Sequence, residues 1–190
     1  MVIEEGKQKR IYVLQNRIDE KNTEHTHMVS LNSKGALQKT YPASWHYSVN
    51  FAPAYRDDQL ISIYRDTLVV LNLKTADLKK VSLSSKSPSY NGYYYDYSRP
   101  VSARPQFFDF LKTGSEQLLL VDEDSVVHLL DGDSFKQLKK YALPAGTETT
   151  PLIADADGDG KLEMLVGCYD GYLYCFDLKT SAKGFIAGLK

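Results

Sequence analysis

The 190-residue sequence has only two cysteines, one tryptophan and no run of 18 consecutive apolar residues. So few cysteines do not decide the redox compartment. Without a long apolar run, we expect no transmembrane helix. The opening Met-Val-Ile-Glu-Glu-Gly-Lys is not typical of a secretion signal. We expect an extracellular, cell-surface or periplasmic location if the chain is an excised domain, and a cytoplasmic location stays open otherwise.

The sequence also lacks an excess of charge of either sign. It has 23 lysines and arginines against 24 aspartates and glutamates, a formal net charge of −1. Binding to the phosphate backbone requires a concentrated basic surface, so no nucleic-acid partner is expected. Glycine-rich phosphate loops, nucleophile elbows and metalloprotease histidine motifs are absent from the sequence as well.

No amphipathic segment of ten or more residues predicts a helix, whereas short strand-like apolar segments recur along the chain. A shift of 46 residues aligns Asp155 with Asp109 and Asp177 with Asp131. Two earlier copies are fainter. The recurrence predicts a protein built from sequence repeats.

Each repeat holds about four short strands in roughly 45 residues, which is the size of a propeller blade. The sequence therefore predicts an all-β fold, a single β-propeller domain or segment over residues 1–190 with about four four-stranded blades. A tyrosine-rich insertion at 87–100 separates the second and third repeats. The repeats cover roughly residues 9–45, 46–86, 101–145 and 147–190.

The last three repeats have a candidate innermost strand, at residues 47–51, 105–109 and 150–154. Only residues 1–8 precede the first repeat, so either they supply its innermost strand or that strand lies outside the chain. Two architectures are open at this point: a small closed four-bladed propeller, and a consecutive part of a larger ring. An open part would expose strand edges and apolar blade faces, which invite self-association or a partner chain.

The most distinctive motif is the loop 155–163, which reads Asp-Ala-Asp-Gly-Asp-Gly-Lys-Leu-Glu. Hard cations such as calcium take about six to eight oxygen ligands, which alternating carboxylates supply. An EF-hand needs Glu at loop position 12, where this chain has Val166, and helical rather than strand-like flanks. Such segments also form ordinary turns, but the spacing within a blade-like repeat favours a metal site. Its carboxylates are Asp155, Asp157, Asp159 and Glu163.

Residues 164–180 alternate apolar and aromatic side chains around Asp170-Gly171, which predicts a hairpin after the loop. Residues 150–180 together resemble an FG-GAP/VCBS repeat, the calcium-loop blade of integrin-type β-propellers. The hairpin also resembles a blade of the PQQ-type propellers. The FG-GAP resemblance implies one structural Ca²⁺, held by the four carboxylates and the backbone carbonyl of Lys161. The family often has Asp at the ninth position, where this chain has the longer Glu163.

The equivalent loops of the other repeats are predicted to be free of metal. Residues 109–117 keep the first carboxylate, Asp109, but lose those at positions 3, 5 and 9. Residues 55–58 are too short to encircle an ion.

The insertion at 87–100 is the second unusual segment. Tyrosine gives large amphipathic contact area at low entropic cost, which favours recognition of a protein or a glycan. Alternatively, these rings cover their own blade or a neighbouring chain. The tyrosines are Tyr90, Tyr93, Tyr94, Tyr95 and Tyr97.

The remaining polar candidates are interpreted structurally. Cys168 and Cys175 are expected as buried free thiols, diagonal to one another on one face of the last hairpin. Residues 17–27, with His25 and His27, are expected to form an exposed polar loop. His128 is interpreted as a packing or surface residue.

The sequence favours a non-catalytic, calcium-stabilised propeller module that binds a protein or glycan in adhesion or recognition. This function is implied by the family resemblance, since a fold alone does not fix a function. Two alternatives stay open. One is a scaffold subunit completed by a partner chain. The other is part of a propeller enzyme, a quinone-dependent dehydrogenase or a polysaccharide lyase, although no base paired with a nucleophile is evident.

Overall fold

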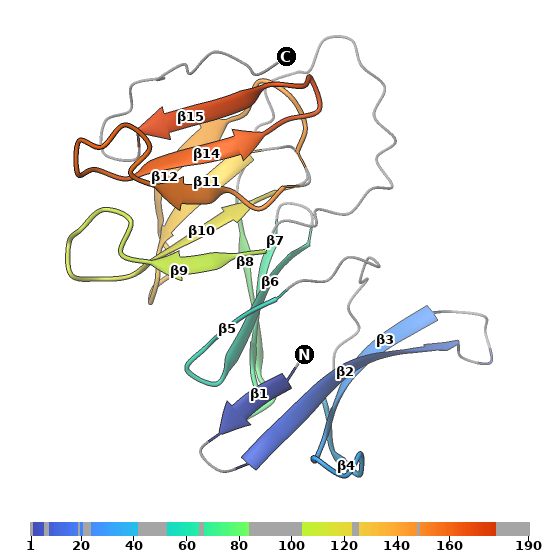
Figure 1. Ribbon diagram of the computed structural model, residues 1–190. Helices are drawn as coiled ribbons and strands as arrows, with labels where there is room; N and C mark the ends of the chain where they lie inside the picture. Colours follow the sequence, from blue (N-terminus) through green and yellow to red (C-terminus); the bar gives the residue numbers. More distant parts are fainter. Residues whose placement is uncertain are drawn as a thin grey trace.

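A computed structural model describes residues 2–5, 8–18, 20, 24–41, 53–64, 67–83, 104–122, 126–147 and 149–177. Within these ranges the chain forms fifteen strands and no helix, so none of the described segments is a helix able to cross a membrane. The strands build four separate antiparallel sheets (Figure 1). The all-β prediction is confirmed.

Each sheet corresponds to one predicted repeat, and the sheets are named blade 1 to blade 4 in chain order. Neighbouring strands in every sheet are consecutive in the chain, so each blade is a simple meander. Blade 1 comprises β1 (Val2–Glu5), β2 (Gln8–Ile18), β3 (Glu24–Leu31) and β4 (Leu37–Tyr41). Blade 2 comprises β5 (Ala54–Arg56), β6 (Gln59–Tyr64), β7 (Thr67–Asn72) and β8 (Leu78–Ser82). Blade 3 comprises β9 (Gln106–Phe108), β10 (Gln117–Val121), β11 (Val126–Asp131) and β12 (Gln137–Ala142). Blade 4 comprises β13 (Leu152–Ala154), β14 (Glu163–Gly167) and β15 (Leu173–Asp177).

The turn between the third and fourth strands is stabilised in the same way in blades 1, 2 and 3. A side-chain oxygen at the end of the third strand accepts hydrogen bonds from backbone N–H groups two to four residues later, as in an Asx turn. These bonds join Lys34 N to Asn32 Oδ1 at 2.9 Å, Lys74 N to Asn72 Oδ1 at 2.9 Å, and Ser134 N to Asp131 Oδ1 at 2.8 Å.

The described residues form three hydrophobic cores, each lying between two successive blades. Strand alternation explains this arrangement, because each blade directs one set of apolar side chains to the preceding blade and the other set to the next. The cores bring together Tyr12 and Met28 with Leu60 and Leu71, Ile61 and Val70 with Leu118 and Leu130, and Leu119 and Leu129 with Met164 and Phe176.

The described residues form an open arc of blades. Cores join blade 1 to 2, blade 2 to 3 and blade 3 to 4, but none of the cores formed by these residues joins blade 4 to blade 1. Figure 1 accordingly shows the blue blade 1 and the red blade 4 at opposite ends of the arc. Of the two predicted architectures, this arrangement matches a consecutive part of a larger ring.

Two predicted strand positions are wrong. The strand that pairs with β6 on the inner side of blade 2 is β5 (Ala54–Arg56), whereas the predicted residues 47–51 lie outside the described residues. Residues 17–27 are not all loop, because β2 and β3 extend into them and pair Arg17 with His25. The innermost strand of blade 1 is β1 (Val2–Glu5), formed by the short segment before the first repeat.

Candidate metal centre

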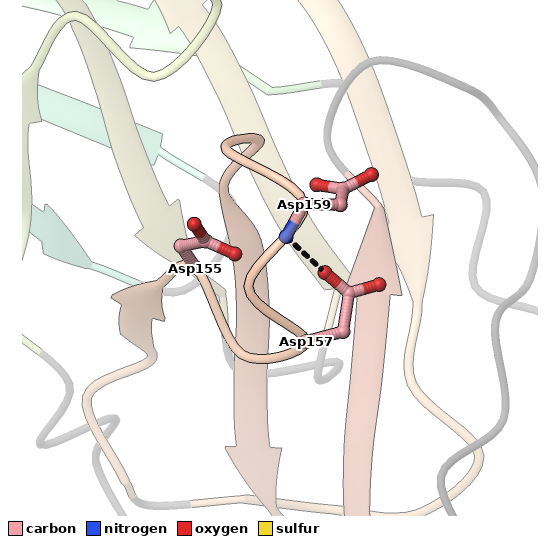
Figure 2. A group of neighbouring side chains, drawn as sticks. All are labelled: Asp155, Asp157 and Asp159. Carbon is pink, nitrogen blue, oxygen red and sulfur yellow. Dashed lines mark hydrogen bonds between the residues drawn. The ribbon is translucent and has the colours of Figure 1, made fainter.

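The loop 155–163 connects β13 to β14 at one end of blade 4. It brings three of the predicted ligands together, since carboxylate oxygens of Asp155, Asp157 and Asp159 lie within 4.8 Å of one another. All three residues are exposed to solvent. Figure 2 shows the three side chains on the curved loop, with the backbone N–H of Asp159 donating to Asp157 Oδ1 at 3.0 Å.

Asp155 is held by the loop's own backbone. Its Oδ1 accepts a hydrogen bond from the N–H of Gly158 at 2.7 Å, and its Oδ2 accepts one from Gly160 at 2.9 Å. Gly160 has a φ of +81°, a left-handed conformation that side chains other than glycine adopt at a cost. The glycines thus allow the loop to curl around its first carboxylate.

Asp159 is paired with a cation from the loop itself. Its Oδ1 accepts the backbone N–H of Lys161 at 2.8 Å, and its Oδ2 contacts the Lys161 ammonium. This side-chain hydrogen bond holds the pKa of Asp159 below its usual value and raises the pKa of Lys161. A metal at this carboxylate would have to compete with the ammonium group.

Glu163 differs from the three aspartates because its side chain is only 8% exposed. It lies at the start of β14, and its Oε2 accepts the backbone N–H of Ala156 at 2.8 Å. The carboxylate therefore folds back over the loop. Glu163 is not part of the cluster of the three aspartates, and the structure gives it a hydrogen bond that stabilises the loop.

The donor set fits a calcium ion. Two oxygens bound to one calcium at about 2.3–2.6 Å can be at most about 5 Å apart, and the three aspartates meet this limit. Carboxylates and backbone carbonyls are also the oxygen ligands that hard cations prefer. By the FG-GAP resemblance, Glu163 and the backbone carbonyl of Lys161 would complete a site whose first three ligands are Asp155, Asp157 and Asp159.

The equivalent loop of blade 3 keeps the fold of the turn without the acidic cluster. Asp109 Oδ2 accepts the N–H of Gly114 at 2.7 Å, and Gln117 Oε1 accepts that of Leu111 at 3.0 Å. Gln117 is buried, like Glu163. The ammonium group of Lys112 in this loop donates a hydrogen bond to the backbone carbonyl of Gly160 in the acidic loop of blade 4.

Blade 2 has an arginine near the corresponding turn, which the sequence analysis did not identify. Arg56 Nη1 donates to Gly132 O at 3.0 Å, and Nη2 contacts Asp133 Oδ1 at 2.6 Å. Its guanidinium also lies 4.9 Å from the centre of the Phe107 ring. Arg56 therefore ties blade 2 to blade 3. Long-range pairing of this kind leaves no local signal in the sequence.

A second unpredicted feature is a buried hydrogen bond in blade 3. His128 Nε2 lies 2.8 Å from Asp122 Oδ2, and both side chains are fully buried. Asp122 Oδ1 also accepts the N–H of Val126 at 2.8 Å. These hydrogen bonds link Asp122, directly after β10, to Val126 and His128 of β11.

The last hairpin differs from its prediction by one residue of register. Gly167 pairs with Leu173, and Cys168 N donates to Tyr172 O, which places Cys175 opposite Leu165 rather than on the face of Cys168. Both thiols are free, as expected, with Cys175 buried and Cys168 half-buried. Burial and the nearby Asp170 carboxylate raise the pKa of Cys168 to about 11.

The tyrosines predicted to contact a partner lie outside the described residues, within 84–103.

No protein-family model matches the sequence, and no curated protein matches it. Among solved structures, the chain is similar to BamB from Moraxella catarrhalis, with a TM-score of 0.57, 14% identity, and coverage of 96% of this chain and 58% of that chain. BamB and the second solved structure, reported below, are both β-propellers. The chain has a β-propeller fold. It is also similar to the C-terminal WD40 domain of Sif2, with a TM-score of 0.51, 8% identity, and coverage of 98% of this chain and 49% of that chain. This propeller chain thus spans about half the length of both neighbours.

Proposed function

We propose that this chain is a non-catalytic, calcium-stabilised propeller module that binds a protein or glycan partner in adhesion or recognition. The observation that carries the calcium part is the convergence of Asp155, Asp157 and Asp159 oxygens within 4.8 Å on one loop. The FG-GAP/VCBS resemblance of residues 150–180 supports the same conclusion. Recognition rests on the tyrosine-rich insertion at 87–100 and on the propeller fold.

The ion would act by stabilising the connection between β13 and β14. When bound, calcium supplies positive charge that offsets the mutual repulsion of the three aspartates. Asp155 and Glu163 sit at the two ends of the loop, so a common ion would link the ends of both strands. Extracellular calcium modules bind with Kd values of about 10⁻⁴ to 10⁻³ M. A site of this exposed kind fits an extracellular, cell-surface or periplasmic location.

A scaffold role is the second candidate, and the open arc of blades favours it. The outer faces of blades 1 and 4 lack a neighbouring blade among the described residues.

An enzymatic role has less support. The buried Asp122–His128 pair has no access to substrate, and the acidic loop residues are accounted for by the proposed metal.

Isothermal titration with calcium chloride tests the metal site. We expect one ion bound per chain, no binding heat for Asp157→Ala, and unchanged binding for Asp77→Ala, a matched exposed aspartate in a turn of blade 2. Absence of binding at millimolar calcium would contradict the calcium assignment.

Recognition is tested on immobilised glycans and cell-surface proteins by replacing all five insertion tyrosines with serine. Equal binding by the two forms would contradict the role of the insertion.

A further inference from the structure

The two ends of the arc carry complementary halves of one interface. In blades 1, 2 and 3, paired residues form a row across the strands, directly before the Asx turn described above. In blade 2 this row is Tyr55, Leu60, Leu71 and Leu78. All four belong to the core shared with blade 1 or pack against it. The row therefore lies on the face of a blade that packs against the preceding blade.

The same row recurs in the next two blades. In blade 3, Phe107, Leu118 and Leu130 are paired across the sheet and contribute to the core with blade 2. In blade 4, Ile153, Met164 and Phe176 are paired in the same way and contribute to the core with blade 3. The interface is thus built three times from equivalent positions.

Blade 1 carries this row too, but no preceding blade is present among the described residues to cover it. The exposed fractions of Val2 and Leu37 are 59% and 61%, whereas Leu78, the equivalent of Leu37, packs against a core. Val13 on the same face is 40% exposed. This surface, named the blade 1 end face, consists of Val2, Ile11, Val13, Leu31 and Leu37.

Blade 4 carries the opposite half of the interface. In blade 3, Leu119 and Leu129 project toward blade 4 and are fully buried there. Their equivalents 46 residues later are Leu165 and Cys175, which pair with each other in the sheet. Leu152, paired with Leu165, is 63% exposed. The blade 4 end face therefore consists of the exposed Leu152 and the half-buried Leu165 and Leu173, while Cys175 in the same row is already buried within the chain.

We propose that the blade 1 end face docks onto the blade 4 end face of a second copy of this chain. The chain forms this kind of interface three times between its own successive blades. Each end face of one copy would therefore meet, on a second copy, the kind of surface that the equivalent face contacts within the chain. Association of unlike faces is heterologous and forms a ring when the rotation closes. Because the chain spans 58% and 49% of two propeller chains, two copies supply about one full ring. Burial of the exposed leucines drives the association.

Sedimentation equilibrium and light scattering on the whole chain test this proposal, which does not depend on calcium. We expect a dimer of twice 21.4 kDa. Leu37→Asp and Leu152→Asp should each give a monomer, while Leu138→Asp should remain dimeric. Leu138 is a suitable control because it is 44% exposed but lies on β12, away from both end faces. Circular dichroism of each variant verifies that the sheets are intact.

Mixing the two monomeric variants distinguishes head-to-tail docking from other dimers. Leu37→Asp keeps an intact blade 4 end face, and Leu152→Asp keeps an intact blade 1 end face. The mixture should therefore recover a heterodimer through one intact interface. A monomeric wild-type chain would overturn the proposal and leave these faces to a different partner. A dimer that survives either single substitution would overturn it as well.

Discussion

Asp155 and Asp109 make the same hydrogen bond to their loops, 46 residues apart in the chain. Asp155 Oδ2 accepts the N–H of Gly160 at 2.9 Å, and Asp109 Oδ2 accepts the N–H of Gly114 at 2.7 Å. Only the loop of Asp155 has the further carboxylates that a cation needs. The first aspartate therefore shapes the turn in both blades, and the calcium site that we propose at blade 4 is separate from this role.

Replacing Asp109 should destabilise the protein equally with and without calcium. Hydrogen bonds from the Thr113 and Gly114 N–H groups keep the pKa of Asp109 below its ordinary value of 3.8. Because the folded-state pKa is depressed, its contribution is fully present above pH 3.8 and is lost as the pH falls through the folded-state pKa. Thermal unfolding of Asp109→Ala at pH 7 should show a lower Tm, and the difference from wild type should shrink in strong acid. A difference that depends on calcium would contradict the separation of the two roles.

Removing the competing ammonium should strengthen calcium binding. Lys161 contacts Asp159 through its side chain, whereas its proposed ligand is the backbone carbonyl, which Lys161→Ala retains. Because exposed ion pairs are weak, we expect Kd to fall by about two- to fivefold. Isothermal titration measures the change, with Lys74→Ala in blade 2 as the control. Weaker binding by Lys161→Ala would show that the ammonium does not compete with the ion.

The packing around Gly132, against the Glu116 carbonyl of blade 3 and Arg56 of blade 2, should not tolerate a methyl group. A Cβ there would lie 2.5 Å from Glu116 O and 2.7 Å from Arg56 Nη1. We expect Gly132→Ala to lower the free energy of unfolding by about 1–3 kcal/mol. Gly167→Ala is the matched control, since its Cβ would meet only Thr149 Cγ2 at 4.0 Å. Urea unfolding of both variants gives the comparison, and equal stability would contradict the tight contact.

The two thiols should react slowly in the native protein. Burial raises the pKa of Cys175 and brings that of Cys168 to about 11, so little reactive thiolate forms near neutral pH. A chromogenic disulfide reagent at pH 8 should label both cysteines readily only after denaturation. Rapid labelling of the folded chain would contradict their placement.

The sequence predicted the repeats, the all-β fold and the acidic loop because these depend on local patterns. The strand β5 was missed because residues 47–51 look more strand-like in the sequence than Ala54–Arg56, which pair with β6. The last hairpin was shifted by one residue because Gly171, with a φ of +83°, closes a longer turn than a two-residue Asp-Gly loop.

Sequence patterns could not predict the contacts between blades. Arg56 and Gly132 are 76 residues apart, and their contact depends on how two sheets pack. The openness of the arc also became evident only from the positions of the three cores. Their equivalence in register then identified the two end faces.

Thermal unfolding in calcium and in excess chelator tests the central claim most directly. An ion that binds only the folded state raises Tm according to its concentration relative to Kd. At roughly a hundredfold excess over Kd, we expect a rise of about 5–10 °C for a chain of this size. Asp157→Ala should abolish the rise, while Asp77→Ala should keep it. An identical Tm with and without calcium in the wild-type chain would contradict the account and reduce the loop 155–163 to a turn.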